Sequence, residues 1–364
     1  MNDRPPSDRP LHVLVVDDSA LVRQAMSSLI TEAQGMSVRV AADPLIAMRK
    51  MAQQRPDVIV LDLEMPRMDG LSFLRKIMAS DPIPVVICSS YAARGTRNAL
   101  RALEHGAVEV LAKPKLGLRG FSQQAATEML DTIRAAAQAQ LRPRAPAPVS
   151  PPAPRFTADA VLSPKAGAPR EIAGEVIVAI GASTGGPEAL RQLLEVLPEE
   201  TPGIVIVQHM PEPFTTTFAE RLNRRCRIEV REAAEGDRVL RGRALIAPGN
   251  RHTMVVAAGN GYRIEVAEGP LVCRHRPSVD VLFRSVAQAA GARSVGVIMT
   301  GMGDDGATGI VEMKRAGAAT IAQDEATCIV FGMPREAIAR GGVDTVVPLG
   351  ELPAVILSRA YGKR

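Results

Sequence analysis

Apolar and polar positions alternate regularly along the first third of the chain. Short runs of aliphatic and β-branched residues recur, and each is followed by a stretch with helical periodicity. Strands that alternate with helices in this way are typical of a parallel, doubly wound sheet. The pattern predicts five strands, at 11–16, 38–42, 57–61, 85–90 and 108–112.

The same alternation resumes near residue 174. It includes one antiparallel element, because the apolar runs 252–258 and 262–267 flank Gly259-Asn260-Gly261, and Asn-Gly tolerates the positive φ of a tight hairpin turn. We therefore expect a second, mostly parallel α/β domain with a β-hairpin. Its other predicted strands are 176–180, 204–208, 228–231, 244–246, 295–299 and 320–322, and its main predicted helices are 187–197, 213–225 and 278–290, with one more ending at 316.

Between these regions the composition changes to Ala and Pro with scattered Arg. Proline-rich segments without an apolar period stay extended and build no core. The sequence thus predicts an N-terminal domain at 10–134, a flexible linker at 135–173 and a C-terminal domain at 174–364.

Composition narrows the functional classes. The net charge is +5, but much of the arginine lies at predicted helix ends and in the linker, and the chain has no Trp, three Tyr and seven Phe for base stacking. We expect no nucleic-acid partner. Because no apolar run approaches the ~20 residues that span a bilayer, and the polar N-terminus lacks the apolar part of a signal peptide, we expect no membrane insertion and a cytoplasmic location.

Charged side chains follow three predicted strands of the N-terminal domain. Asp17 and Asp18 end the first strand, Asp62 ends the third and Lys113 ends the fifth. The carboxyl ends of parallel strands meet at one edge of a sheet, where three carboxylates would repel unless a divalent cation lay among them. Oxygen ligands beside a lysine favour Mg²⁺ together with a phosphoryl anion.

In the C-terminal domain, the strand at 176–180 ends abruptly in the turn GASTGG, and a helix begins at Pro187. Glycines permit positive φ angles, and proline suits the first helical position. Gly181-x-Ser183-x-Gly185 has the spacing of a nucleophile elbow, in which a sharp strand-to-helix turn exposes a serine Oγ. The same residues fit a glycine-rich phosphate cradle, and the turn alone does not decide between them.

Three apolar runs of this domain end in side chains suited to nucleophilic acyl transfer: Ser183, His209 and the pair Asp304-Asp305. If the strands are parallel, these groups meet at one edge. Their chain order differs from the Ser, Asp, His order of α/β-hydrolases, so the geometry would be convergent on a different fold. Spacing does not choose between Asp304 and Asp305.

Two further observations bear on this edge. His252 and His275 follow loop residues, so they fit the role of the base less well than His209. Backbone N–H groups in the glycine-rich turns after Ala182 and Thr300 would form an oxyanion hole; Thr184 is the candidate donor in the first turn.

The N-terminal domain closely resembles the receiver domain of two-component response regulators, which has a flavodoxin-like five-stranded parallel sheet. One position departs from the common pattern, because Val110 stands where many receivers have an aromatic switch residue. The resemblance rests on Asp17-Asp18, on Asp62 within VLDLEMPRMDG, on Ser89 at the end of the fourth strand and on Lys113-Pro114.

This resemblance implies a phosphorylation site. Asp62 would accept a phosphoryl group, and Mg²⁺ would be held by Asp17, Asp18, Asp62 and the backbone carbonyl of Glu64. Lys113 would pair with the phosphoryl oxygens, and Ser89 would act as the hydroxyl switch.

The C-terminal domain resembles the CheB family of chemotaxis protein-glutamate methylesterases, and the two domains follow one another in that family's order. The motifs that carry the resemblance are GASTGG, QHM followed by PFTTTFAERLN, APGN, TGMGDDG and FGMPREAI. It implies hydrolysis of glutamate γ-methyl esters on the cytoplasmic helices of chemoreceptors, with release of methanol and, in some members, deamidation of receptor glutamines. It also implies that the esterase site uses no cofactor.

The family pattern assigns Ser183 as the nucleophile, His209 as the base, Asp305 as the orienting acid and the Met302 backbone N–H as an oxyanion donor. It further implies that the unphosphorylated receiver covers the catalytic edge, and that phosphorylation by a chemotaxis histidine kinase relieves this block.

Two other functional classes remain as alternatives. The second domain would be a non-catalytic phosphate- or nucleotide-binding module if GASTGG were an anion cradle at a helix N-terminus. A DNA-binding regulator fits less well, because the sequence after the linker lacks a helix-turn-helix pattern or a basic recognition helix.

Overall fold

The computed structural model describes residues 9–65, 70–89, 93–113, 123–139, 156–164 and 175–362. The chain divides into two compact units, Met1–Pro152 and Ala153–Arg364, and each is described by itself. Pro114 of the Lys-Pro pair, Ser90 and much of the predicted linker lie outside the described residues.

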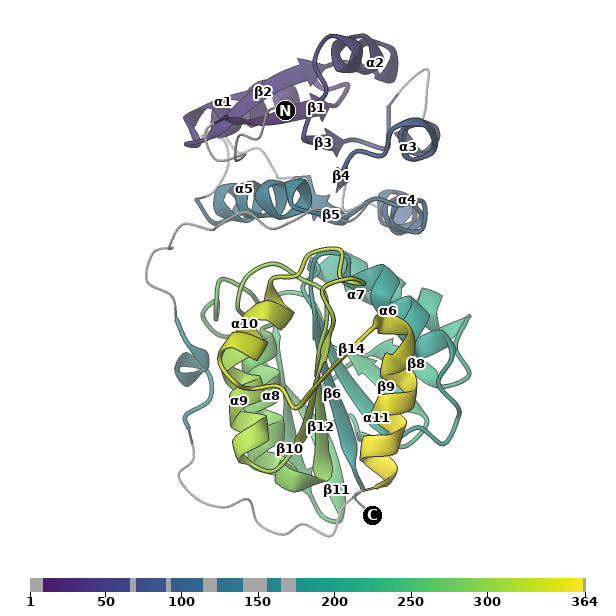
Figure 1. Ribbon diagram of the computed structural model, residues 1–364, viewed down its shortest axis with the longest axis vertical. Helices are drawn as coiled ribbons and strands as arrows, with labels where there is room; N and C mark the ends of the chain where they lie inside the picture. Colours follow the sequence, from purple (N-terminus) through teal and green to yellow (C-terminus); the bar gives the residue numbers. More distant parts are fainter. Residues whose placement is uncertain are drawn as a thin grey trace, which may run out of the picture. The chain divides into compact units, whose positions relative to one another are not determined.

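The first unit is a five-stranded parallel sheet in the order β2-β1-β3-β4-β5, so the predicted parallel α/β fold is confirmed. Helices α1 and α5 lie on one face, and α2, α3 and α4 lie on the other (Figure 1). The elements are β1 (Leu11–Val16), α1 (Ala20–Glu32), β2 (Met36–Ala41), α2 (Pro44–Gln53), β3 (Val58–Leu61), α3 (Gly70–Ser80), β4 (Val85–Ser89), α4 (Ala93–Glu104), β5 (Glu109–Ala112) and α5 (Gln123–Ala137).

Two helices of this unit begin where the sequence supplies a side-chain cap. The Ser19 hydroxyl accepts a hydrogen bond from the Val22 N–H at the start of α1, and Asp43 does the same for Ile46 at the start of α2. Because these caps follow β1 and β2 closely, the chain turns back over the sheet directly after each strand ends.

The second unit contains a seven-stranded sheet in the order β14-β13-β12-β6-β7-β9-β8, and every pairing in it is parallel. The chain leaves the central strand β6 in one direction through β7 and later builds the other half from β12. The strands are β6 (Ile177–Ala182), β7 (Gly203–Gln208), β8 (Glu229–Glu232), β9 (Arg243–Ile246), β12 (Ser294–Ile298), β13 (Ala319–Gln323) and β14 (Thr345–Val347).

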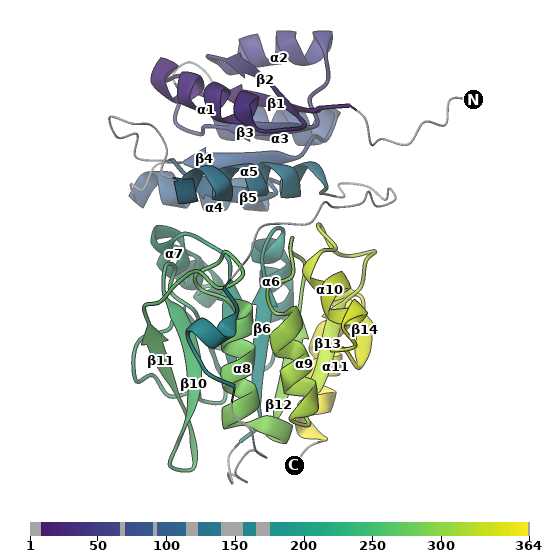
Figure 2. The same cartoon turned by 90° about the vertical axis from the view of Figure 1, so that its left-hand side faces the viewer.

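Two helical layers enclose this sheet, with α8, α9 and α10 on one face and α6, α7 and α11 on the other (Figures 1 and 2). The elements α10, β14 and α11 were not predicted from the sequence. The helices are α6 (Gly186–Glu195), α7 (Glu212–Asn223), α8 (Val279–Ala289), α9 (Ala307–Arg315), α10 (Met333–Ala339) and α11 (Leu352–Tyr361).

The predicted hairpin is present as the antiparallel pair β10 (His252–Ala258) and β11 (Gly261–Ala267). Its turn lies one residue earlier than the Asn-Gly pair suggested. Ala258 pairs with Gly261, which leaves Gly259 and Asn260 as the turn, and Gly259 supplies the positive φ of 56°. A glycine at the first turn position meets the backbone requirement that we had assigned to Asn-Gly.

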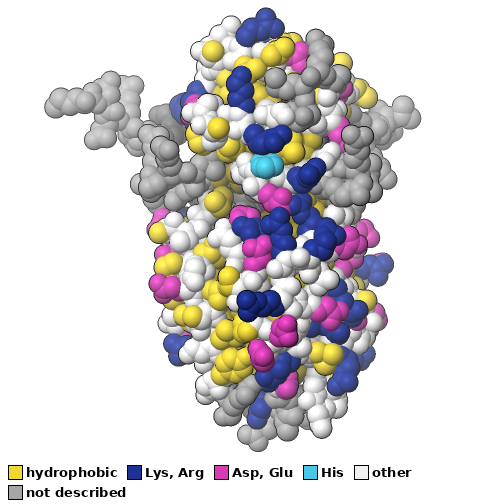
Figure 3. All heavy atoms as spheres, turned by 90° about the vertical axis from the view of Figure 1, so that its right-hand side faces the viewer, with side chains coloured by type: hydrophobic (Ala, Val, Ile, Leu, Met, Phe, Trp, Pro, Cys, Tyr) yellow, Lys and Arg dark blue, Asp and Glu magenta, His cyan; other side chains and the backbone are white. Residues whose placement is uncertain are grey.

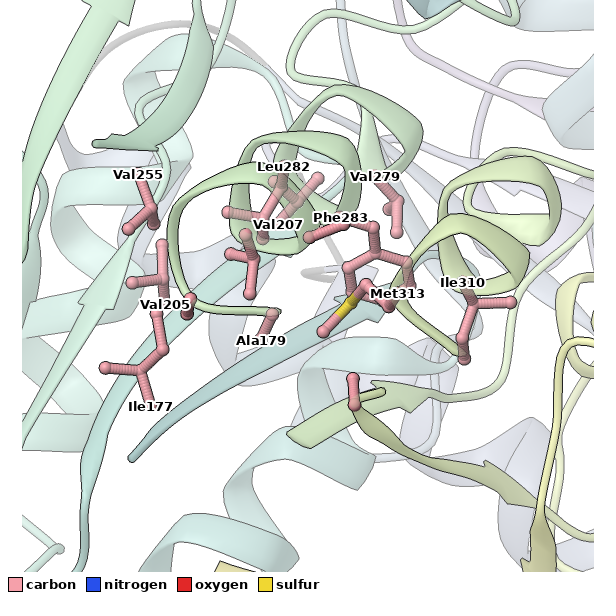
Figure 4. Packing of buried hydrophobic residues seen from close by; sticks show 14 of the residues in the cluster. Ile177, Ala179, Val205, Val207, Val255, Val279, Leu282, Phe283, Ile310 and Met313 are labelled. Atoms are coloured by element: carbon pink, nitrogen blue, oxygen red, sulfur yellow. The ribbon is translucent and has the colours of Figure 1, made fainter. Parts of the chain in front are cut away.

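The core of the second unit lies between the sheet and α8. Phe283 and Leu282 of α8 are fully buried, and burial of side chains of this size stabilises a fold by ~1.5–3 kcal/mol each. Figure 4 shows aliphatic side chains of β6, β7, β10 and α9 meeting those of α8. The N-terminus of α8 is thereby fixed against the ends of β6 and β12.

Residues 156–164 differ from the expectation of a flexible linker. They include a short 3-10 helix, η1 (Ala158–Ala160), and Ala158 is buried in a small apolar cluster with Met254, Val272 and Val281 of the second unit. The Ala/Pro composition concealed this contact, because a single buried alanine leaves no apolar period.

None of the described helices is long and apolar enough to cross a membrane. On the face drawn in Figure 3, Lys and Arg side chains stand among Asp and Glu side chains.

Candidate active site and phosphoacceptor site

The carboxyl ends of three neighbouring strands bring the predicted catalytic residues together. Ala182 of β6 pairs with Gln208 of β7, so Ser183 and His209 leave adjacent strands at the same level. The loop after β12, which carries Asp305, lies on the other side of β6. Since the chain reverses its direction of winding between β6 and β12, this edge is the switch point where doubly wound sheets form sites.

Ser183 lies in a turn whose backbone is fixed on both sides. Its N–H donates to the Thr300 carbonyl at 3.0 Å, and its carbonyl accepts from the Gly186 N–H at 2.7 Å. Gly185 adopts a φ of 77° just before α6, which is the positive angle expected for this turn. Ser183 as a residue is 7% exposed, so it lies in a nearly closed site.

His209 and Asp305 form the central polar contact of this edge. His209 Nε2 lies 2.8 Å from Asp305 Oδ2, and the Asp305 side chain is completely buried. Asp305 also accepts hydrogen bonds from the Val279 N–H at 2.7 Å, the Asp280 N–H at 3.0 Å and the Ser278 hydroxyl at 2.8 Å. The carboxylate therefore receives the first backbone donors of α8, where the helix dipole favours negative charge.

These contacts determine the ionisation of Asp305. Burial alone would raise its pKa, but the hydrogen bond from His209, the positive charge that His209 can carry and the backbone donors together hold the pKa below its usual value. An ionised Asp305 fixes His209 Nε2 as the protonated nitrogen. The other ring nitrogen, Nδ1, is buried and has no hydrogen-bond partner among the described residues. Nδ1 is thus the atom available to take a proton.

The structure distinguishes the two aspartates that spacing left equivalent. Asp304 is partly exposed, with 27% of its side chain accessible, and forms an ion pair with Arg340 at 2.8 Å. Of the two aspartates, Asp305 is the one that contacts His209. The difference depends on α8, because its N-terminal N–H groups point at Asp305.

Two N–H groups near Ser183 are placed as candidate oxyanion donors. Within the described part of the chain, the N–H groups of Thr184 and Met302 donate to no acceptor, whereas the Gly301 N–H is bonded to the Val330 carbonyl. Gly301 is required where it is, since a Cβ there would lie 2.7 Å from the Cβ of Ser183 and 2.4 Å from the Met333 sulfur.

Sequence reasoning missed three residues around the His–Asp pair. His275, set aside because it follows a loop, stacks its ring on that of His209 with centroids 3.7 Å apart and planes 5° apart. Ser278 and Asp280 were treated only as parts of a helix. Ser278 gave one available signal, because a serine at the first position of the predicted helix 278–290 is typical of an N-cap.

Asp280 is a second buried carboxyl beside Asp305. Burial and the negative charge of Asp305 raise the pKa of Asp280 to about 7. Its Oδ1 accepts from the Gly309 N–H at 2.6 Å, which ties α8 to α9. The pKa of Asp280 is thereby raised and that of Asp305 is lowered, so Asp305 is the carboxyl that stays ionised.

In the first unit, the predicted phosphoacceptor residues also meet at one sheet edge. Lys113 Nζ lies 2.7 Å from Asp62 Oδ2 and 2.9 Å from Asp17 Oδ2. Burial raises the pKa of Asp62, an effect only partly offset by the hydrogen bonds from Lys113 and from the Glu64 N–H. Carboxylate oxygens of Asp17, Asp18 and Asp62 all lie within 4.8 Å of one another, which suits a hard cation with oxygen ligands such as Mg²⁺.

The remaining receiver residues lie on β4 and β5. Ser89 ends β4 and is buried, and its hydroxyl has no hydrogen-bond partner among the described residues. Val110 lies on β5 and is 2% exposed. The aliphatic side chain at this position is therefore part of the core.

Comparison with known proteins identifies the family of each unit. A family model described as CheB methylesterase matches residues 178–356, and one described as response regulator receiver domain matches residues 13–117. Protein-glutamate methylesterase/protein-glutamine glutaminase 5 of Anaeromyxobacter dehalogenans is 59% identical over 96% of this chain and 97% of its own length. The protein of the same description numbered 3 in Geobacter metallireducens is 55% identical over 96% of this chain and 99% of its own.

A solved structure supports the fold of the second unit. The CheB methylesterase catalytic domain of Thermotoga maritima is 37% identical, with a TM-score of 0.50, and the match covers 51% of this chain and 98% of that chain. The resemblance inferred from the sequence motifs is thereby confirmed, and the chain belongs to the CheB methylesterase family, as a member with an N-terminal response regulator receiver domain.

Proposed function

We propose that this protein is a protein-glutamate methylesterase that hydrolyses glutamate γ-methyl esters on chemoreceptors and is activated by phosphorylation of its receiver. The observation that carries the proposal is the contact between His209 and a fully buried Asp305 at the strand edge that presents Ser183. A phosphate cradle would need no such pair, so the non-catalytic binding module is not favoured.

The chemistry follows from these positions. Ser183 Oγ attacks the ester carbonyl carbon while His209 Nδ1 takes its proton, and Asp305 stabilises the imidazolium. The N–H groups of Thr184 and Met302 bind the developing oxyanion, each worth about 3 kcal/mol to the transition state. His209 returns the proton to the methoxy group, and methanol leaves. Water then hydrolyses the acyl-enzyme by the same route to release glutamate, and a glutamine substrate would release ammonia.

The receiver would control this activity. Asp62 would accept the phosphoryl group from a chemotaxis histidine kinase. Asp17, Asp18 and the Glu64 carbonyl would help to hold Mg²⁺, which would supply positive charge next to the phosphoryl group when bound. Lys113, already next to Asp62, can follow the phosphoryl oxygens. The Ser89 hydroxyl, which has no hydrogen-bond partner in the part of the chain that the structure describes, can also move toward them. The substrate would be the cytoplasmic helices of chemoreceptors, which places the enzyme in the cytoplasm.

Methanol release from methylated receptor membranes, measured with a small phosphodonor and Mg²⁺, tests the function. Ser183→Ala should lower the rate by several powers of ten, because removal of one triad member disables the whole group. Ser358→Ala, a change of the same size at an exposed position on α11, is the matched control and should keep full activity. If Ser183→Ala kept more than about a tenth of the rate, or if a fluorophosphonate failed to label Ser183, the assignment would be wrong.

A further inference from the structure

Residues 156–163, here called the strap, lie in the range predicted as linker but are packed on the second unit. The buried face of η1 consists of Ala158, which is 3% exposed. It contacts the apolar cluster formed by Met254 of β10, Val281 of α8 and Val272. Ala160, two residues further, is exposed. The strap therefore has one docked face and one free face.

A buried arginine of α8 anchors the strap by charge. The Arg284 side chain is 5% exposed and forms ion pairs with Asp159 of the strap and with Glu312 of α9. It also donates to the Leu162 carbonyl at 2.9 Å. A buried guanidinium left without a charged or hydrogen-bonding partner destabilises the fold. The strap supplies two of the partners of Arg284, so its contact with α8 contributes to stability.

The N-terminal end of the strap is hydrogen-bonded to the tight turn Val272–His275. The Phe156 carbonyl accepts from the Cys273 N–H at 3.0 Å, and Phe156 pairs with Val272 as an isolated bridge. Within this turn, Cys273 and Arg274 have φ angles of 47° and 70°, in the left-handed region that residues other than glycine rarely adopt. Such a backbone persists only where its surroundings hold it.

This turn places the His275 ring next to that of His209, the proposed base. Val272 and His275 exchange backbone hydrogen bonds of 3.1 and 2.8 Å across the turn, so the place of the His275 ring follows from the place of the turn. That ring lies flat on His209, parallel within 5°. The strap therefore contacts the Val272–His275 turn, and this turn contacts His209 through the His275 ring.

We propose that the strap is a positioning element of the esterase site, which holds the Val272–His275 turn so that His275 fixes the ring plane of His209. This inference rests on the proposed function. The strap contacts neither Ser183 nor the oxyanion donors, so its release should change the proton-transfer step and leave substrate binding intact. A shift of the base by about an ångström can lower kcat by about a hundred-fold.

Full-length protein carrying Ala158→Glu tests the proposal, because the new carboxylate cannot enter the apolar cluster and the strap must leave. Ala160→Glu, the same change on the free face, is the matched control. A second variant replaces residues 156–163 with a Gly-Ser sequence of equal length, which removes every docking contact. Methanol release with phosphodonor gives kcat and KM, and imidazole NMR resonances report the rings directly, since the chain has only five histidines.

We expect both strap variants to lower kcat by about ten- to a hundred-fold at unchanged KM, and to shift the His209 and His275 resonances but not those of His12 and His105. Ala160→Glu should match the unaltered protein. Unchanged kcat and unchanged His209 and His275 resonances in the Gly-Ser variant would overturn the proposal; if that variant failed to fold, Ala158→Glu would decide by the same criteria. The spectra do not depend on turnover, so they test the strap even if the protein proved not to be an esterase.

Discussion

Asp305→Asn removes the charge from a buried carboxylate that accepts four hydrogen bonds, with very little change of shape. An asparagine there has two orientations. With its NH₂ in the place of Oδ2, it faces the Val279 N–H and His209. With its NH₂ in the place of Oδ1, it faces the Asp280 N–H. In either orientation one buried backbone donor loses its acceptor, at a cost of about 1–3 kcal/mol, and the helix dipole loses its counter-charge, at up to about 2 kcal/mol.

The effect on catalysis should be larger than the effect on folding. A neutral amide cannot stabilise the His209 imidazolium, and in one orientation it also reverses the tautomer, so that Nδ1 would carry the proton and could not act as the base. In serine-protease triads the same change lowers kcat by about 10⁴. We expect a loss of that order in methanol release, together with destabilisation of about 1–5 kcal/mol in urea unfolding.

Asp304→Asn is the matched control. Asp304 is partly exposed and paired with Arg340, and such surface pairs contribute about 0–1 kcal/mol. Its activity should stay within a few-fold of the unaltered protein. Similar losses in the two variants, or a larger loss for Asp304→Asn, would refute the assignment of the orienting acid.

Three further predictions follow from other parts of the chain. Gly301→Ala should inactivate the enzyme by displacing Ser183, and the overpacking should destabilise the fold by about 1–3 kcal/mol. Gly350→Ala, whose new methyl group meets open space, should leave the rate of methanol release unchanged. Asp62→Asn should abolish labelling by a radioactive phosphodonor, and removal of Mg²⁺ with EDTA should do the same to the unaltered protein; persistent labelling would show another acceptor. Because Asp280 has a raised pKa in the folded protein, the folded state holds its proton more tightly than the unfolded state between pH 3.8 and about 7, so the unfolding free energy falls as pH rises through that window. Asp280→Asn cannot ionise and should become more stable relative to the unaltered protein as the pH rises from about 4 to 7; a difference independent of pH would contradict this.

Both candidate sites could be predicted from the sequence, because the ends of the strands are visible in it. An apolar run that stops at Ser183, His209 or Asp62 places that side chain at the edge of a parallel sheet. The order of the strands in the sheet then determines which of these side chains lie next to each other. Strand spacing alone did not choose between Asp304 and Asp305, although the family motif pointed to Asp305. The choice depends on how the N-terminus of α8 approaches the loop after β12, which is a contact between distant segments.

His275 shows the same limit more clearly. Read locally, it follows loop residues and is a poor candidate for any role at the strand edge. Its place beside His209 results from a left-handed turn and from the strap, neither of which leaves a period in the sequence. The elements β14 and α10 were missed for a different reason, because they have only three and seven residues and leave little periodicity in the sequence.

The position of β6 in its sheet has a consequence for folding. One of its neighbours, β7, follows after a single helix, while the other, β12, is reached only after the hairpin and α8. Pairing β6 with β12 closes a long loop. The chain loses conformational entropy before the stabilising contacts between the two strands form, so this folding step is slow. During synthesis, Ser183 and His209 leave the ribosome well before Asp305, and a nascent chain therefore carries the nucleophile and the base without the acid that orients them. Ester hydrolysis begins only when the last third of the protein has been made and has docked on its central strand.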